Sequence, residues 1–66
     1  MLKGRVTKFD TAVGLGAVRA DDGVDYEFHA IELVDGSRSI DLGQVVVFQP
    51  LPKFGRQQAG QIRKVD

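Results

Sequence analysis

His29 is the only histidine in the sequence, and its ring can stack on a base, bond a phosphate or move a proton. It ends residues 25–29, a segment whose alternation places Glu27 and His29 on one outward face. No serine, cysteine or pair of carboxylates is spaced to form a nucleophile constellation with it, so we expect no enzyme. The sequence has no cysteine, and a lone histidine makes no metal site without carboxylate help, so we expect no cofactor. A surface histidine without a function is an equally good interpretation.

Basic side chains are the second feature that indicates chemistry, because lysine and arginine bond phosphate groups. Arg5, Lys8 and Arg19 fall in the first two alternating segments. A second group near the C-terminus consists of Lys53, Arg56, Arg63 and Lys64. Nine Lys/Arg and nine Asp/Glu cancel to a net charge of zero, which removes long-range attraction to a polyanion. Nucleic-acid binding would therefore depend on a local patch, whereas each basic residue taken singly is more simply a solvated charge.

The length of 66 residues predicts one domain, since domains typically contain about 100–150 residues. A chain of this size buries only about 60% of the surface that its unfolded form exposes, which leaves no room for a core and a deep substrate cleft. No apolar run approaches the roughly 20 residues of a membrane span. The N-terminal residues lack the apolar stretch of a signal peptide. We expect a soluble cytoplasmic protein with no membrane contact.

The residues that could do chemistry lie in segments where apolar and polar side chains alternate, which is typical of half-buried strands. The third strand should bury its two aromatic residues, and Pro50 and Pro52 should end the fourth because proline cannot donate to a ladder. In the fifth strand, Ala59 and Ile62 should lie on opposite faces. The expected strands cover residues 2–9, 13–20, 25–29, 44–49 and 58–65.

Five short strands in so small a chain predict a closed barrel, because closure removes exposed strand edges. The Greek-key form of this architecture is the OB-fold, so we expect an all-β, five-stranded antiparallel OB-fold barrel. Val45 and Val47 should face outward from the fourth strand. They could contact a protein partner or form a homodimer edge, although β-branched residues are also common at half-exposed strand positions.

Six motifs occur in chain order with nearly the spacing of one known family. They are GRVTKFD at residues 4–10, VGLGAV at 13–18, DDG at 21–23, YEFH at 26–29, DLGQVVVF at 41–48 and QAGQI at 58–62. Together they resemble the cold-shock domain family from residue 4 to residue 65, which identifies residues 1–66 as a single cold-shock-like domain. The resemblance implies a barrel that binds single-stranded RNA or DNA by stacking bases on exposed aromatic residues, with lysines along the phosphates.

The chain departs from this family at the positions that carry the exposed aromatic residues. Those positions hold Lys8, Leu15, Ala17, Glu27 and Ala30, while the family's lysines fall on Thr7 and Val13. Phe9 and His29 remain at stacking positions. Each stacked base contributes roughly 1–3 kcal/mol, so losing four or five contacts should remove several kcal/mol of binding free energy.

The resemblance and the departures together predict a weak single-strand binder. The expected nucleic-acid-binding residues are Arg5, Lys8, Phe9, Leu15, His29 and Arg56. The alternative is an OB-fold module for protein interaction that has lost nucleic-acid binding, which the residues Ala17, Glu27 and Ala30 favour.

Overall fold

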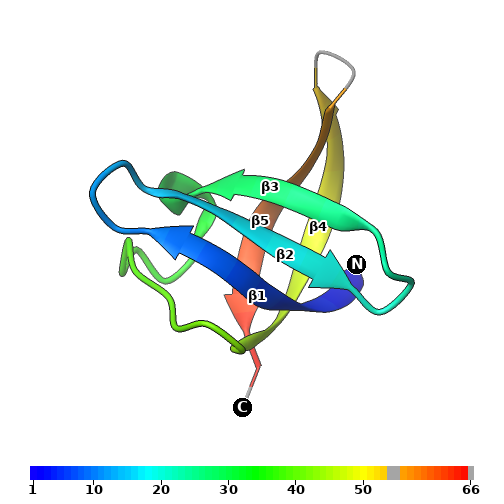
Figure 1. Cartoon of the computed structure of the whole chain (residues 1–66), viewed down its shortest axis with the longest axis horizontal. Helices are drawn as coiled ribbons and strands as arrows, with labels where there is room; N and C mark the ends of the chain where they lie inside the picture. Colours follow the sequence, from blue (N-terminus) through cyan, green and yellow to red (C-terminus); the bar gives the residue numbers. More distant parts are fainter. Residues whose placement is uncertain (54–55, 66) are drawn as a thin grey trace.

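Five strands and one short 3₁₀ helix make up the structure (Figure 1). The computed structural model describes residues 1–53 and 56–65, apart from the side chains of Lys53 and Arg56. The elements are β1 (Leu2–Asp10), β2 (Leu15–Ala20), β3 (Asp25–His29), the helix η1 (Ala30–Glu32), β4 (Val45–Lys53) and β5 (Arg56–Lys64). The strands close into a barrel in the order β1-β2-β3-β5-β4. Among the described residues, no helix is long and apolar enough to span a membrane.

The strand directions in the barrel are mixed. β1 pairs antiparallel with β2 and with β4, β2 with β3, and β4 with β5. β3 and β5 instead run parallel where Glu27 pairs with Gln58. The expectation of a wholly antiparallel barrel is therefore wrong at one junction. Neighbouring directions must alternate in an antiparallel ring, and an odd number of strands cannot alternate all the way round.

The barrel interior holds the apolar residues that the alternation assigned to it. In β3 the aromatic residues Tyr26 and Phe28 are buried while Glu27 and His29 are exposed, as predicted. The rings of Tyr26 and Phe48 have centroids 5.0 Å apart and are tilted by 60°, a favourable edge-on geometry. The buried cluster is completed by Val6, Val18, Ala20, Leu33, Ile40, Val46, Ala59 and Ile62. This packing holds the outer surfaces of the strands in fixed positions.

A bulge in β1 decides which side chains reach the outer surface. Val6 pairs with Val18 and Lys8 with Ala17, so β1 contains one residue more than β2 over this step. The extra residue is Thr7, and its hydroxyl donates to the carbonyl oxygen of Ala17 at 3.4 Å. Because a bulge shifts the alternation by one, Thr7 and Lys8 both face solvent.

A second bulge corrects the prediction for β5. Val47 pairs with Arg63 and Gln49 with Gly60, so β5 carries an extra residue there. Gln61 lies between these pairs and has a φ of 50°, the left-handed region that few non-glycine residues adopt. The strict alternation predicted opposite faces for Ala59 and Ile62, yet both are buried.

The prolines do not end β4, contrary to expectation, since the strand runs to Lys53. Pro50 pairs with Ala59 and Pro52 with Gln57. Successive residues of a strand direct their N–H groups to alternate edges, so both prolines lack a donor on the same edge. β1 pairs with β4 only as far as Phe48. Along the segment 49–53 one edge therefore has no described partner, and prolines are tolerated there as on any sheet edge.

Candidate nucleic-acid interface

Three rows of side chains cross the outer surface of β1, β2 and β3, which we call the outer face. The strand register brings each row together, one residue from each strand. Every member is exposed except Ala17, which is partly covered. The rows are Arg5–Arg19–Asp25, Lys8–Ala17–Glu27 and Asp10–Leu15–His29. Residues scattered over 25 positions of the sequence thus share one surface.

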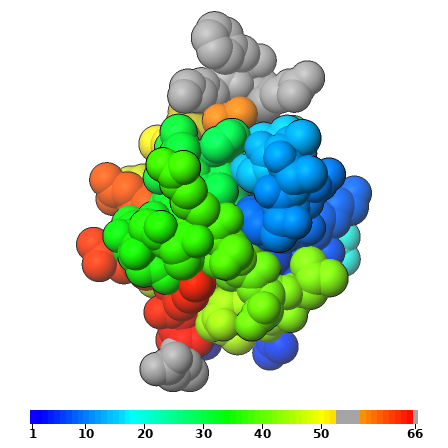
Figure 2. Space-filling view, turned by 90° about the vertical axis from the view of Figure 1, so that its left-hand side faces the viewer, coloured from blue at the N-terminus to red at the C-terminus, as the bar shows by residue number. Residues whose placement is uncertain are grey.

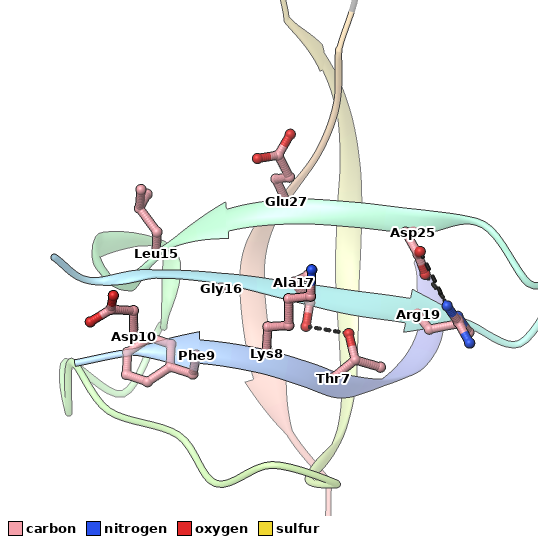
Figure 3. A pocket seen from close by; sticks show the side chains of 10 residues that line it. All are labelled: Thr7, Lys8, Phe9, Asp10, Leu15, Gly16, Ala17, Arg19, Asp25 and Glu27. Atoms are coloured by element: carbon pink, nitrogen blue, oxygen red, sulfur yellow. Dashed lines mark hydrogen bonds and ion pairs between the residues drawn. The ribbon is translucent and has the colours of Figure 1, made fainter. Parts of the chain in front are cut away.

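A shallow hollow of about 640 Å³ lies in this outer face (Figure 3). Of the residues expected from the sequence, Lys8, Phe9 and Leu15 line the hollow. Arg5 and His29 lie on the same face but outside the hollow. The side chain of Arg56 is outside the described part of the chain. The structure therefore gathers three of the six expected residues around one depression.

The floor of the hollow is formed by the small residues Gly16 and Ala17 of β2. A Cβ atom on Gly16 would stand 2.6 Å from the carbonyl oxygen of Lys8 and 2.6 Å from Cζ of Phe28. A side chain at Gly16 would thus displace either the β1 backbone or a core ring. Sequence reasoning did not assign Gly16 a place in the site, although a glycine inside a strand is a signal of close backbone approach.

Phe9 belongs both to the hollow and to the core. Its ring lies almost parallel to that of Phe28, with centroids 5.9 Å apart and an angle of 10° between the planes. Phe28 is only 3% exposed, and Phe9 is partly buried against the same apolar cluster. Stacking on Phe28 fixes the Phe9 ring, so what reaches the hollow is the remaining exposed part of that ring.

His29 is exposed, and its side chain makes a structural hydrogen bond at the end of β3. Its Nδ1 atom accepts a hydrogen bond from the backbone N–H of Ile31 at 3.2 Å, which caps η1. The neutral ring therefore carries its proton on Nε2. Gly14 lies against the His29 ring. A Cβ atom added to Gly14 would be 3.5 Å from Cε1 of that ring. The Ala30 N–H donates to the Gly14 carbonyl oxygen at 2.7 Å, so the first loop, residues 11–14 between β1 and β2, lies beside η1 (Figure 2).

The charges of the outer face are partly neutralised within it. Arg19 donates from Nε to Oδ1 of Asp25 at 2.8 Å and from Nη2 to Oδ2 at 3.3 Å. These hydrogen bonds hold the pKa of Asp25 below its ordinary value and raise the pKa of Arg19. Arg5 and Lys8 form no ion pair with any described residue. The sequence analysis did not predict this pair, although Arg19 and Asp25 lie at equal distances from the 21–23 turn, as cross-strand partners do.

The comparisons with known proteins support this description of the fold. No protein-family model and no curated protein sequence matches the chain. A solved structure of Drosophila Unr, containing its cold-shock domains 4, 5 and 6, is similar with a TM-score of 0.83 and 27% sequence identity. The similarity covers 98% of this chain and 26% of the Unr chain.

The barrel, the order of its motifs and the Unr similarity agree with one another. The resemblance read from the sequence is confirmed, and the family is one of nucleic-acid-binding domains. In its fold and in the order of its motifs, the chain resembles the cold-shock domains of Unr, and its five-stranded barrel is consistent with such a domain.

Proposed function

We propose that this domain binds single-stranded nucleic acid, RNA or DNA, weakly and through its outer face. The observation that carries the proposal is the position of Arg5 and Lys8. Both are exposed on β1, beside the hollow or on its edge, and neither forms an ion pair with a described residue, although the charge of Lys8 helps to lower the pKa of Asp25. Cations on one strand can follow a phosphate backbone while the bases lie over the neighbouring small residues of β2.

Apolar contact with the bases falls to Leu15 and the exposed part of Phe9. Leu15 is 54% exposed at the end of the hollow. A leucine removes apolar base surface from water but lacks the π-face of the aromatic residues that the family displays. His29 can donate from Nε2 to a phosphate or base while Nδ1 remains on Ile31. Arg56 stays in the proposal on its place in the sequence alone.

The salt dependence of binding tests the proposed role of the two cations. For single strands, log K falls against log[salt] with a slope of about −0.7 per phosphate neutralised, so two contacts give about −1.4. Lys8→Gln and Arg5→Gln should each weaken binding of a uridine hexamer and make the slope shallower by about 0.7. Arg63→Gln, which removes an exposed cation from β5, is the matched control and should change neither quantity appreciably. Slopes that stay the same in both β1 variants would refute the assignment.

A protein-interaction module is the second candidate function, and exposed apolar side chains around the first loop favour it. Val13 is 57% exposed, Leu15 54% and Ile31 69%. The hydrogen bond between Ala30 and Gly14 brings the two segments that carry these residues together. If no oligonucleotide binds, sedimentation of the protein alone at increasing concentration will show whether this surface joins two copies. If the protein is a monomer and binds no nucleic acid, the interaction module must bind a different protein.

A further inference from the structure

Arg19 lies at one end of the hollow, in the middle of the row Arg5–Arg19–Asp25. Its neighbour on β1, Arg5, has the same charge, and like charges directly opposite each other on adjacent strands repel. Its neighbour on β3, Asp25, has the opposite charge. Both neighbours therefore favour a conformation in which Arg19 turns toward β3, and the structure contains the resulting ion pair with Asp25.

The two hydrogen bonds of this pair fix the plane of the guanidinium group. Nε donates to Oδ1 at 2.8 Å and Nη2 donates to Oδ2 at 3.3 Å, which is the fork-like arrangement of a bidentate pair. Exposed ion pairs generally hold their side chains weakly, and bidentate arginine–carboxylate pairs are the exception. Because the N–H groups point outward in the guanidinium plane, Asp25 occupies the edge of Arg19 and leaves its faces uncovered. The Arg19 side chain is 60% exposed despite the pair.

The pairing changes what Arg19 can offer to a nucleic acid. The hydrogen bonds raise the pKa of Arg19 and lower the pKa of Asp25, so both groups stay ionised and their charges cancel locally. A neutralised pair attracts a phosphate group only weakly. The flat face of the guanidinium group remains available, and bases stack on guanidinium planes as well as on aromatic rings.

The surface next to this plane leaves room for a base. Leu15 and Arg19 lie four residues apart on β2, about 13 Å at 3.3 Å per residue. Between them on the outer face are only Gly16 and Ala17, because Val18 is buried in the barrel. A flat ring in contact on both faces needs about 7–8 Å, twice the separation of carbon atoms in contact. Figure 3 shows Arg19 at one end of the hollow and Leu15 toward the other.

We propose that Arg19 takes the place of a missing aromatic residue: its guanidinium plane, positioned by Asp25, stacks on a base bound in the hollow. The inference rests on the proposed function and adds a binding residue to it. Every base has a π-face, so this contact tolerates any base. It differs in kind from the contacts proposed for Arg5 and Lys8, which are with phosphates.

Arg19→Lys tests the plane, because lysine keeps the positive charge and can still pair with Asp25 but has no planar group. NMR titration with a uridine hexamer at low salt should give an affinity about fivefold lower than that of the parent protein, the lower end of what one stacked base contributes. The slope of log K against log[salt] should not change, since no phosphate contact is lost. Arg63→Lys makes the same change at an exposed position of β5 and should bind as the parent protein does.

The Nε–H proton of Arg19 reports the contact directly in the parent protein. A base stacked on the guanidinium plane shields this proton by its ring current and should shift its signal upfield, whereas a hydrogen bond to a phosphate would shift it downfield.

The role of Asp25 is tested against that of another carboxylate. Asp25→Asn removes the charge that positions Arg19, and Asp21→Asn removes the same charge from the exposed turn between β2 and β3, outside the hollow. A purely electrostatic effect would strengthen binding of the hexamer in both variants. Loss of positioning should make Asp25→Asn bind more weakly than Asp21→Asn.

Binding with full affinity by Arg19→Lys, or a downfield shift of the Nε–H proton, overturns the stacking role of Arg19 and leaves the proposed function standing. Equal affinity of Asp25→Asn and Asp21→Asn overturns the positioning role of Asp25. Absence of binding by the parent protein overturns the proposed function and this inference with it. Amide spectra of each variant establish that it is folded.

Discussion

The side chain of Leu15 provides much of the apolar surface that the outer face can offer to a base. Leu15 stands at the rim of the hollow, more than half exposed, where a larger ring would meet solvent rather than the core. Phe9 cannot play this part to the same extent, because its ring is stacked on Phe28. The missing aromatic residues are therefore a matter of single positions, and an aromatic ring can be restored one position at a time.

Leu15→Phe should strengthen binding of a uridine hexamer. A stacked base contributes about 1–3 kcal/mol, which corresponds to a gain of about fivefold or more in affinity. NMR titration of the variant beside the parent protein measures the gain. Leu42→Phe is the control, since Leu42 is also more than half exposed but lies in the turn before β4 and does not line the hollow. An equal gain in both variants would mean that added apolar surface, and not stacking in the hollow, is responsible.

The segment between η1 and β4 is held to β5 by a cluster of polar contacts. Nζ of Lys64 lies 3.0 Å from Oδ2 of Asp35, 3.1 Å from Oγ of Ser37 and 3.3 Å from the carbonyl oxygen of Ser39. The backbone N–H of Ser37 donates to Oδ1 of Asp35 at 3.0 Å. Hydrogen bonds from Ser37, followed by that from Lys64, lower the pKa of Asp35 from 3.8 to about 2.

Acid should loosen this segment within a defined pH window. Because the pKa of Asp35 is lower in the folded protein, the unfolded chain binds the proton more readily, and stability increases with pH between about 2 and 4. The stabilisation is complete above pH 4 and disappears as the pH falls through about 2. NMR titration of the Asp35 carboxyl carbon measures its pKa directly. In Asp35→Asn this part of the pH dependence of unfolding should vanish, whereas Asp21→Asn should retain it.

Among the secondary-structure elements, the positions of the strands were predicted better from the sequence than the positions of their bulges and ends. All of β3 was predicted residue for residue, because its five residues alternate without interruption. The bulges at Thr7 and Gln61 were missed, because an extra residue in one strand is defined by the register of its partner. The start of β2 moved from Val13 to Leu15 for a similar reason. Gly14, with a φ of 73°, donates to the carbonyl oxygen of Asp10 at 2.8 Å and closes the turn.

The same distinction applies to the candidate site. The expected residues Arg5, Lys8 and Leu15 share the outer face because strand alternation and the family motifs both place them there. The floor at Gly16 and the Arg19–Asp25 pair depend on contacts across strands. Such contacts follow from the pairing register, which the sequence alone does not specify.

The whole molecule combines a net charge of zero with a closed barrel that leaves one broad surface on β1, β2 and β3. Zero net charge gives no long-range steering of a polyanion, so the association rate should depend little on the overall field. On the proposed function, affinity comes from the exposed cations of β1 and the hollow on the outer face itself. We therefore expect a bound single strand to occupy the side of the barrel formed by β1, β2 and β3.

Titration of the protein with a uridine hexamer at low salt, followed by backbone amide shifts, shows which side of the barrel is occupied. We expect progressive shifts of amides in β1, β2 and β3, largest at Lys8, Leu15 and Gly16. Amides of the segment 33–44 should remain unchanged. This expectation is contradicted if no amide of the outer face moves at millimolar ligand, or if the shifts gather on β4, β5 and the segment 33–44 instead.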